Sequence, residues 1–249
     1  MLRWLCFLLV LVMVGTTPVI AEKKNGYEFQ SDDVQALQDD DFSNPGMLWV
    51  DEGRTLFDQA PAAEVKSCRN CHKQVEGIAN RYPKINSRLG KLVSLTEQVQ
   101  ICRETYQGQP PIEYEGQPAL ALTAYVANQS KGLPLLKPEG KALEAAVKQG
   151  KDYYYARKGQ LNLSCAQCHE DNSGRYLRGD LISQGRSNGY PIYRLEWESL
   201  GSVHRRFRAC DIGVRAEPFE PGSEVYTSLE LYLRDRSATL PMTAPAVRR

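Results

Sequence analysis

Two short stretches with the same pattern decide the fold of this chain: residues 68–72 read Cys-Arg-Asn-Cys-His, and residues 165–169 read Cys-Ala-Gln-Cys-His. Both match C-x-x-C-H, the motif by which c-type haem is attached to protein. Two thiols one helical turn apart can bond to the two haem vinyl groups, and the adjacent histidine then reaches the iron. A zinc half-site or a thioredoxin-type redox pair does not need that histidine. The sequence therefore predicts two covalent c-type haems, held by Cys68, Cys71, Cys165 and Cys168, with His72 and His169 as axial ligands.

The residues in front of the two motifs repeat as well, which predicts two domains rather than two isolated motifs. Gly53 and Gly150 each lie fifteen residues before the first cysteine of a motif, and each is followed by a basic, a polar and two bulky residues. Both glycines belong to amphipathic stretches, over residues 45–59 and 140–157, whose periodicity predicts helices.

A second repeated element follows each motif. Residues 122–134 and 229–241 align without gaps on a shared Leu-x-x-Tyr, a serine and a closing Leu-Pro. An early helix, C-x-x-C-H and a late Leu-x-x-Tyr helix resemble the class I cytochrome c fold, in which the two helices cross and pack over the haem. We therefore expect a mainly α chain with two tandem class I cytochrome c-like domains, residues 22–137 and 138–249. The link falls near 135–140, where prolines and a glycine interrupt the helical pattern.

Each unit carries one further cysteine at an equivalent place. Cys102 lies 20 residues before Leu122, and Cys210 lies 19 residues before Leu229. A six-coordinate haem takes a second axial ligand, commonly Met or His, but no methionine lies between either motif and its late helix. Cys102 and Cys210 are therefore the predicted second ligands of the first and second iron. Two alternatives stay open: a Cys102–Cys210 disulfide, and His204 as the ligand of the second haem.

The residues around Cys210 are rich in arginine. The cluster consists of Arg205, Arg206, Arg208 and Arg215. Guanidinium groups bind oxyanions through paired hydrogen bonds and lower the pKa of a nearby thiol. A thiolate is a nucleophile, so this setting suits a small sulfur oxyanion such as thiosulfate or sulfite. The alternative is that the arginines pair with haem propionates or form a solvated face.

Composition and the first residues bound the class of protein. The 31 basic and 30 acidic residues are balanced, which argues against nucleic-acid binding. Residues 1–21 read as a secretory signal, because Arg3 precedes a short apolar run and the segment closes on small residues at Ala21. A retained membrane anchor is the alternative, but the run is shorter than the ~20 residues that span a bilayer. We expect export to the periplasm, with cleavage removing Cys6 and leaving six cysteines.

With these residues in view, the chain resembles the SoxA family, the dihaem cytochrome c subunits of SoxAX complexes in the Sox system of thiosulfate oxidation. The resemblance extends over essentially the whole chain after residue 21 and is most specific in residues 185–191, 194–197 and 204–210. It implies an L-cysteine S-thiosulfotransferase that oxidatively joins thiosulfate to a cysteine of the SoxYZ carrier. The implied partners are a SoxX-like monohaem cytochrome c subunit and a soluble cytochrome c that accepts two electrons.

The resemblance also implies roles for single residues. Cys210 would be the catalytic sulfur, found in the family as a persulfide, as well as a ligand of the second haem. Arg206, four residues earlier, would be the substrate arginine, with Arg205 and Arg208 as further candidates. Some members of the family have lost the first haem and keep a disulfide in its place. This chain retains the residues of that haem, Cys68, Cys71, His72 and Cys102, as in the dihaem form.

Other functions remain open on the sequence. A thiosulfate dehydrogenase that forms tetrathionate would use a similar cysteine-ligated haem and anion pocket without a carrier protein. A non-catalytic dihaem electron carrier would keep its function when Cys210 is replaced by Met. A dihaem peroxidase needs an iron with an open or labile position, and the two ligand cysteines argue against it.

Overall fold

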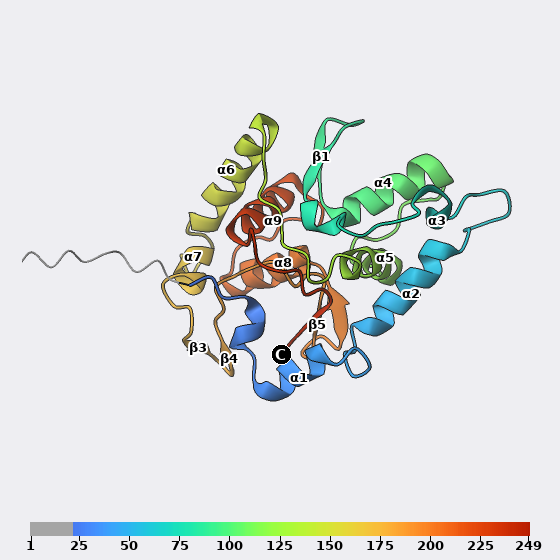
Figure 1. The fold of residues 1–249 in the computed structure, drawn as a ribbon. Coiled ribbons are helices and arrows are strands. Elements are labelled where there is room, and N and C mark those ends of the chain that lie inside the picture. Colours follow the sequence, from blue (N-terminus) through green and yellow to red (C-terminus); the bar gives the residue numbers. More distant parts are fainter. Residues whose placement is uncertain (1–21) are drawn as a thin grey trace, which may run out of the picture.

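The computed structural model describes residues 22–249 and is mainly helical (Figure 1). The expected signal segment, residues 1–21, lies outside the described residues. Two pairs of long helices organise the chain. These are α2 (Met47–Asp58) with α5 (Gln117–Asn128), and α6 (Lys141–Tyr155) with α9 (Glu224–Arg236). They are the early and late helices that the repeated flanks predict, and the expected mainly α class is confirmed.

A glycine at each crossing lets the helices of a pair touch. A Cβ on Gly53 would lie 2.0 Å from the carbonyl oxygen of Ala121, and a Cβ on Gly150 would lie 2.0 Å from that of Ser228. No side chain fits at such a distance, so glycine is what allows the two backbones to approach. The repeated glycine in the sequence therefore marks the crossing point of the early and late helices in both units.

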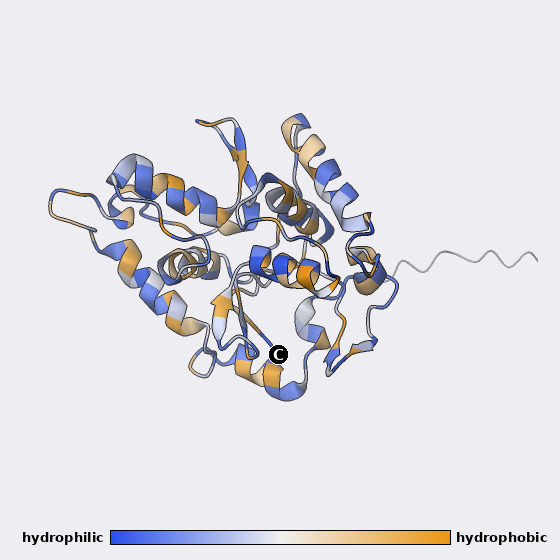
Figure 2. Cartoon of the chain, turned by 180° about the vertical axis from the view of Figure 1, so that it is seen from behind, coloured by the Kyte–Doolittle hydropathy of each residue, from blue (hydrophilic) through white to orange (hydrophobic). Residues whose placement is uncertain are grey.

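The outer and inner helices of each pair are buried to different degrees. Hydrophobic and hydrophilic residues alternate along α2 and α6 as in amphipathic helices (Figure 2), and few of their residues are buried. Most residues of α5 and α9 are buried, because these helices pack on several elements. No helix of residues 22–249 combines the length and apolar composition that crossing a membrane requires.

Between its long helices, each unit holds the same series of smaller elements. The motif cysteines lie on the short helices α3 (Cys68–Cys71) and α7 (Cys165–His169), and a serine capping box opens each. An antiparallel hairpin follows, and then a helix that carries the remaining cysteine. In the first unit these are β1 (Lys84–Asn86), β2 (Lys91–Val93) and α4 (Leu95–Gln107). In the second unit they are β5 (Ile192–Arg194), β6 (Ser199–Gly201) and α8 (Val203–Gly213).

The second unit contains one element that the first lacks. A small hairpin, β3 (Tyr176–Leu177) with β4 (Asp180–Leu181), lies between α7 and β5. The motifs are 97 residues apart, whereas Cys102 and Cys210 are 108 residues apart. The β3–β4 hairpin lies within this additional length, directly after the motif histidine.

Both ends of the described chain pack on the second unit. Helix α1 (Asp32–Asp39) contacts the last strand, β7 (Ala246–Arg248), which pairs in parallel with β5. The Gln38 side chain accepts hydrogen bonds from the Val247 backbone and from Arg248. A 3-10 turn, η1 (Gly26–Phe29), precedes α1, and another, η2 (Ala79–Arg81), precedes β1.

The two units share part of their core. The cluster around α2 and α5 includes Leu200, Met242 and Ala244 from the second half of the chain, and the loops meet in a bridge between Pro134 and Pro241. The units are therefore joined by packing as well as by the link, and the boundary between residues 137 and 138 stays a prediction.

Candidate functional site

The histidine of the second motif and Cys210 face each other. The thiol of Cys210 on α8 is hydrogen-bonded with the imidazole of His169 at the end of α7. The other ring nitrogen, Nδ1, lies 2.7 Å from the carbonyl oxygen of Ser183. A carbonyl can only accept, so Nδ1 carries the proton and leaves Nε2 for Cys210 or for a metal. An imidazole and a thiol aimed at each other are a donor pair that suits the two axial positions of a haem iron.

The backbone around the second motif is shaped to the imidazole. Gly185 has φ of +65°, and a Cβ there would lie 2.9 Å from Cγ of His169. The glycine therefore lets the chain pack directly on the ring, while the Ser183 carbonyl fixes its rotation. Such outer partners are what orient a ligating histidine in metalloproteins.

A basic cavity opens beside the same histidine. It measures about 580 Å³, and Lys24, Arg186 and Arg236 are among the residues that line it with His169. Three cations at one cavity suit the carboxylate edge of a haem, and the four residues together fit this cofactor.

Arg206 supplies positive charge to Cys210. It precedes Cys210 by one helical turn on α8, which places both side chains on one face of the helix. Burial by itself raises the pKa of the Cys210 thiol, but the charge of Arg206 and the hydrogen bond with His169 bring that pKa below its ordinary value. The site therefore favours the thiolate.

The two other predicted substrate arginines contact different partners. The guanidinium of Arg205 lies 4.3 Å from the ring centroid of Trp197. Arg208 pairs with Glu220 at 3.1 Å. With 3.6 residues per turn, neither position shares the face of α8 that carries the cysteine. Of the three, Arg206 is the one that the structure brings to the thiol.

Asp211, directly after Cys210, has a role that the sequence does not reveal. Its buried carboxylate accepts hydrogen bonds from the hydroxyls of Tyr153 at 2.8 Å and Tyr226 at 2.7 Å. Lys158 pairs with it at 3.0 Å. These partners belong to α6, to α9 and to the segment before α7, so the carboxylate fixes α8 against its surroundings. In the sequence Asp211 is a lone acid among arginines, and no local signal links it to these residues.

In the first unit the cysteines come together but the histidine does not join them. Burial, and the neighbouring thiol of Cys102, raise the pKa of the Cys68 thiol. Gln98 donates a hydrogen bond to Cys102 Sγ at 3.2 Å. His72 is exposed at the end of α3, and among the described residues no counterpart of the Ser183 carbonyl holds its ring. The first site is therefore less preformed than the second.

Neither sequence-based alternative for Cys210 is supported. His204 is fully buried, with Nδ1 accepting from the Gly222 backbone at 2.9 Å and Nε2 bonded to Glu230 at 3.1 Å. An imidazole with both nitrogens engaged has none left for iron. All six cysteines of residues 22–249 are free, and the motif helices α3 and α7 lie on opposite sides of the molecule (Figure 1). A Cys102–Cys210 disulfide is therefore not formed.

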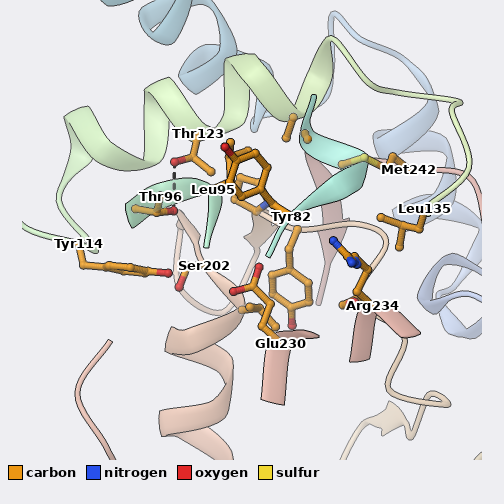
Figure 3. Close-up of a pocket in the computed structure, with 16 residues that line it drawn as sticks. Tyr82, Leu95, Thr96, Tyr114, Thr123, Leu135, Ser202, Glu230, Arg234 and Met242 are labelled. Atoms are coloured by element: carbon orange, nitrogen blue, oxygen red, sulfur yellow. Dashed lines mark hydrogen bonds between the residues drawn. The ribbon is translucent and has the colours of Figure 1, made fainter. Parts of the chain in front are cut away.

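A small cavity lies between the two units and is separate from both motifs (Figure 3). It measures about 60 Å³, and Tyr82, Thr96, Glu230 and Arg234 are among its lining residues. Sites for small organic ligands usually have about 300–1,000 Å³, so this cavity belongs to the contact between the units.

Comparison with known proteins identifies relatives over most of the chain. Residues 52–135 match the family model described as SoxA/TsdA, cytochrome c domain, which confirms the predicted class of cofactor, c-type haem. The chain is 38% identical to the L-cysteine S-thiosulfotransferase subunit SoxA of Rhodovulum sulfidophilum, over 91% of this chain and 80% of that protein. It is 34% identical to the protein of the same name from Paracoccus pantotrophus, over 90% and 78%. A crystal structure of SoxXA from P. pantotrophus superposes with a TM-score of 0.87 at 32% identity, covering 90% of this chain and 86% of that chain.

Proposed function

The chain belongs to the SoxA family, and we propose that it is the catalytic dihaem subunit of an L-cysteine S-thiosulfotransferase. The observation that carries this proposal is the grouping of His169, Cys210 and Arg206 at the second motif. It combines a ligand pair for iron, a sulfur held as thiolate and a cation for an oxyanion. A simple electron carrier has no use for the last two.

Two c-type haems are the proposed cofactors. Cys165 and Cys168 would hold the second haem, with His169 and Cys210 as its axial ligands. The first haem would be held by Cys68 and Cys71, with His72 and Cys102 as its axial ligands. When bound, these haems supply one-electron redox chemistry near the substrate sulfur.

Thiosulfate is the proposed substrate, and Arg206 would bind its sulfonate oxygens through charge-assisted hydrogen bonds. The Cys210 thiolate and the outer sulfur of thiosulfate form an S–S bond with loss of two electrons. The thiolate of a carrier cysteine then attacks that outer sulfur, forms the new S–S bond and releases the Cys210 thiolate. Overall, one thiosulfate and one carrier thiol give a cysteine S-thiosulfonate, one proton and two electrons. A soluble cytochrome c takes the electrons one at a time.

The proposed assembly follows the relatives. The superposed crystal structure is of SoxXA, which supports a SoxX-like monohaem cytochrome c as the partner subunit. SoxYZ is the proposed carrier of the accepting cysteine. The secretory pattern of residues 1–21 supports a periplasmic location.

A reconstituted assay tests the proposal. The holoprotein with its SoxX-like partner is mixed with thiosulfate and oxidised cytochrome c, with and without SoxYZ. We expect cytochrome c reduction that requires SoxYZ, and a carrier mass increased by one thiosulfonate group. Tetrathionate formation without carrier would identify a thiosulfate dehydrogenase instead. Full transfer by Cys210→Met would reduce the chain to an electron carrier.

A further inference from the structure

The two units differ at matched positions beside their ligand cysteines. Their hairpins and cysteine-bearing helices are aligned at a constant offset of 108 residues, from β1 and β5 to Cys102 and Cys210. At this offset Gln98 in α4 corresponds to Arg206 in α8, and Asn86 in β1 corresponds to Arg194 in β5. Two amides in the first unit therefore occupy the places of two guanidinium groups in the second.

The two amides form a hydrogen-bonded chain whose direction is fixed by the backbone. Asn86 Oδ1 accepts from the backbone N–H groups of Arg88 and Leu89, both at 3.0 Å. Because an N–H group can only donate, this oxygen is correctly identified, and Nδ2 is the atom that faces Gln98. It donates to Gln98 Oε1 at 2.9 Å. Gln98 Nε2 is then left to donate to Cys102 Sγ at 3.2 Å.

A donor aimed at a ligand sulfur has a predictable electronic effect. It withdraws electron density from the thiolate, so the iron it ligates is reduced more easily. A neutral amide also differs from a guanidinium in offering no net charge to an anion. The first unit thus has the means to adjust a haem without the means to hold thiosulfate.

We propose that Gln98, oriented by Asn86, is the positioning residue that raises the reduction potential of the first haem through its hydrogen bond to Cys102. This inference rests on the proposed function, because it takes Cys102 as the axial ligand of that haem. It gives the first haem the role of a tuned redox centre, distinct from the substrate site at the second.

The test uses the purified dihaem protein and reads each haem separately. Gln98→Leu removes the donor at similar size. Gln100→Leu is the matched control, because Gln100 lies on the same helix but two residues from Cys102 and therefore on another face. We expect Gln98→Leu to shift the potential of the first haem to a lower value and to change its electron paramagnetic resonance g-values. The second haem in this variant, and both haems in Gln100→Leu, should keep wild-type values.

A further variant separates this inference from the ligand assignment. Loss of the thiolate signature of the first haem in Cys102→Ser would establish Cys102 as its ligand, whatever Gln98 does, and persistence of that signature would overturn the assignment. With the ligand established, an unchanged potential and unchanged g-values in Gln98→Leu would overturn the role of Gln98. If Gln98→Leu is not recovered with two haems, Gln98→Glu takes its place at pH 8, where an ordinary carboxylate is ionised. Its lower potential would support the inference, and an unchanged one would refute it.

Discussion

In the second unit an arginine stands one helical turn before the ligand cysteine, and a backbone carbonyl holds the motif histidine. In the first unit a glutamine stands at the matching place, and the motif histidine is exposed. The helix crossings, the hairpins and the capped motif helices are nevertheless the same in both. Two sites on one scaffold can therefore differ in chemistry through a few side chains that leave the packing unchanged.

The difference in histidine geometry follows from the unequal lengths of the units. Ser183 and Gly185, which hold and contact His169, come directly after the β3–β4 hairpin. The first unit has no such hairpin among its described elements, so its chain runs from the motif to η2 without a segment that could cover His72. The added residues thus build one wall of the second site.

The largest contrast is expected between the two ligand cysteines. Cys210→Ser should lower thiosulfate-dependent cytochrome c reduction by roughly 10³-fold or more, because it removes the reacting sulfur. Cys102→Ser should leave most of that activity, since the first unit has no anion-binding arginine. Steady-state turnover of the two holoproteins with SoxYZ measures the contrast. Equal losses would mean that the first site takes part in the chemistry.

The next contrast concerns how firmly each cysteine-bearing helix is held. Asp211→Ala removes a buried carboxylate with three partners and should lower the free energy of unfolding by about 3 kcal/mol. Its counterpart at the same offset is Arg103, and Arg103→Ala should cost less than about 1 kcal/mol. Urea unfolding followed by circular dichroism compares the two. A larger loss for Arg103→Ala would show that α4 is anchored by its arginine.

A third variant gives the second unit the side chain of the first. Arg206→Gln should lower kcat/KM for thiosulfate about 10- to 100-fold, because a charged hydrogen bond of about 1.5–3 kcal/mol is lost. Arg205→Gln is the control, since its guanidinium stacks on Trp197 and should change kcat/KM less than about threefold. Equal effects would place both arginines at the substrate and contradict the observed orientation.

The sequence predicts the scaffold better than the sites. The motifs, the glycines at the helix crossings and the matched cysteines are all local patterns, so they can be read without coordinates. Strands of three residues carry too little periodicity to be found. The partners of Asp211 are joined to it by packing alone, as are Ser183 and His169. The orientation of Arg205 and Arg208 could have been foreseen, because helical spacing already separates their faces from that of Cys210.

The smallest expected effect sharpens the comparison most, because it tries to give the first site what the second has. Gln98→Arg places a guanidinium one turn before Cys102, and thiosulfate should then bind near the first haem about tenfold more tightly than in the wild type. Titration of the absorption spectrum of that haem with thiosulfate measures this affinity. Gln100→Arg adds the same charge on another face of α4 and should not change it. If both variants gain equally, net charge is sufficient and position is irrelevant. A gain confined to Gln98→Arg would mean that one side chain, at a fixed place on a repeated scaffold, separates a site for an oxyanion from a site for electrons alone.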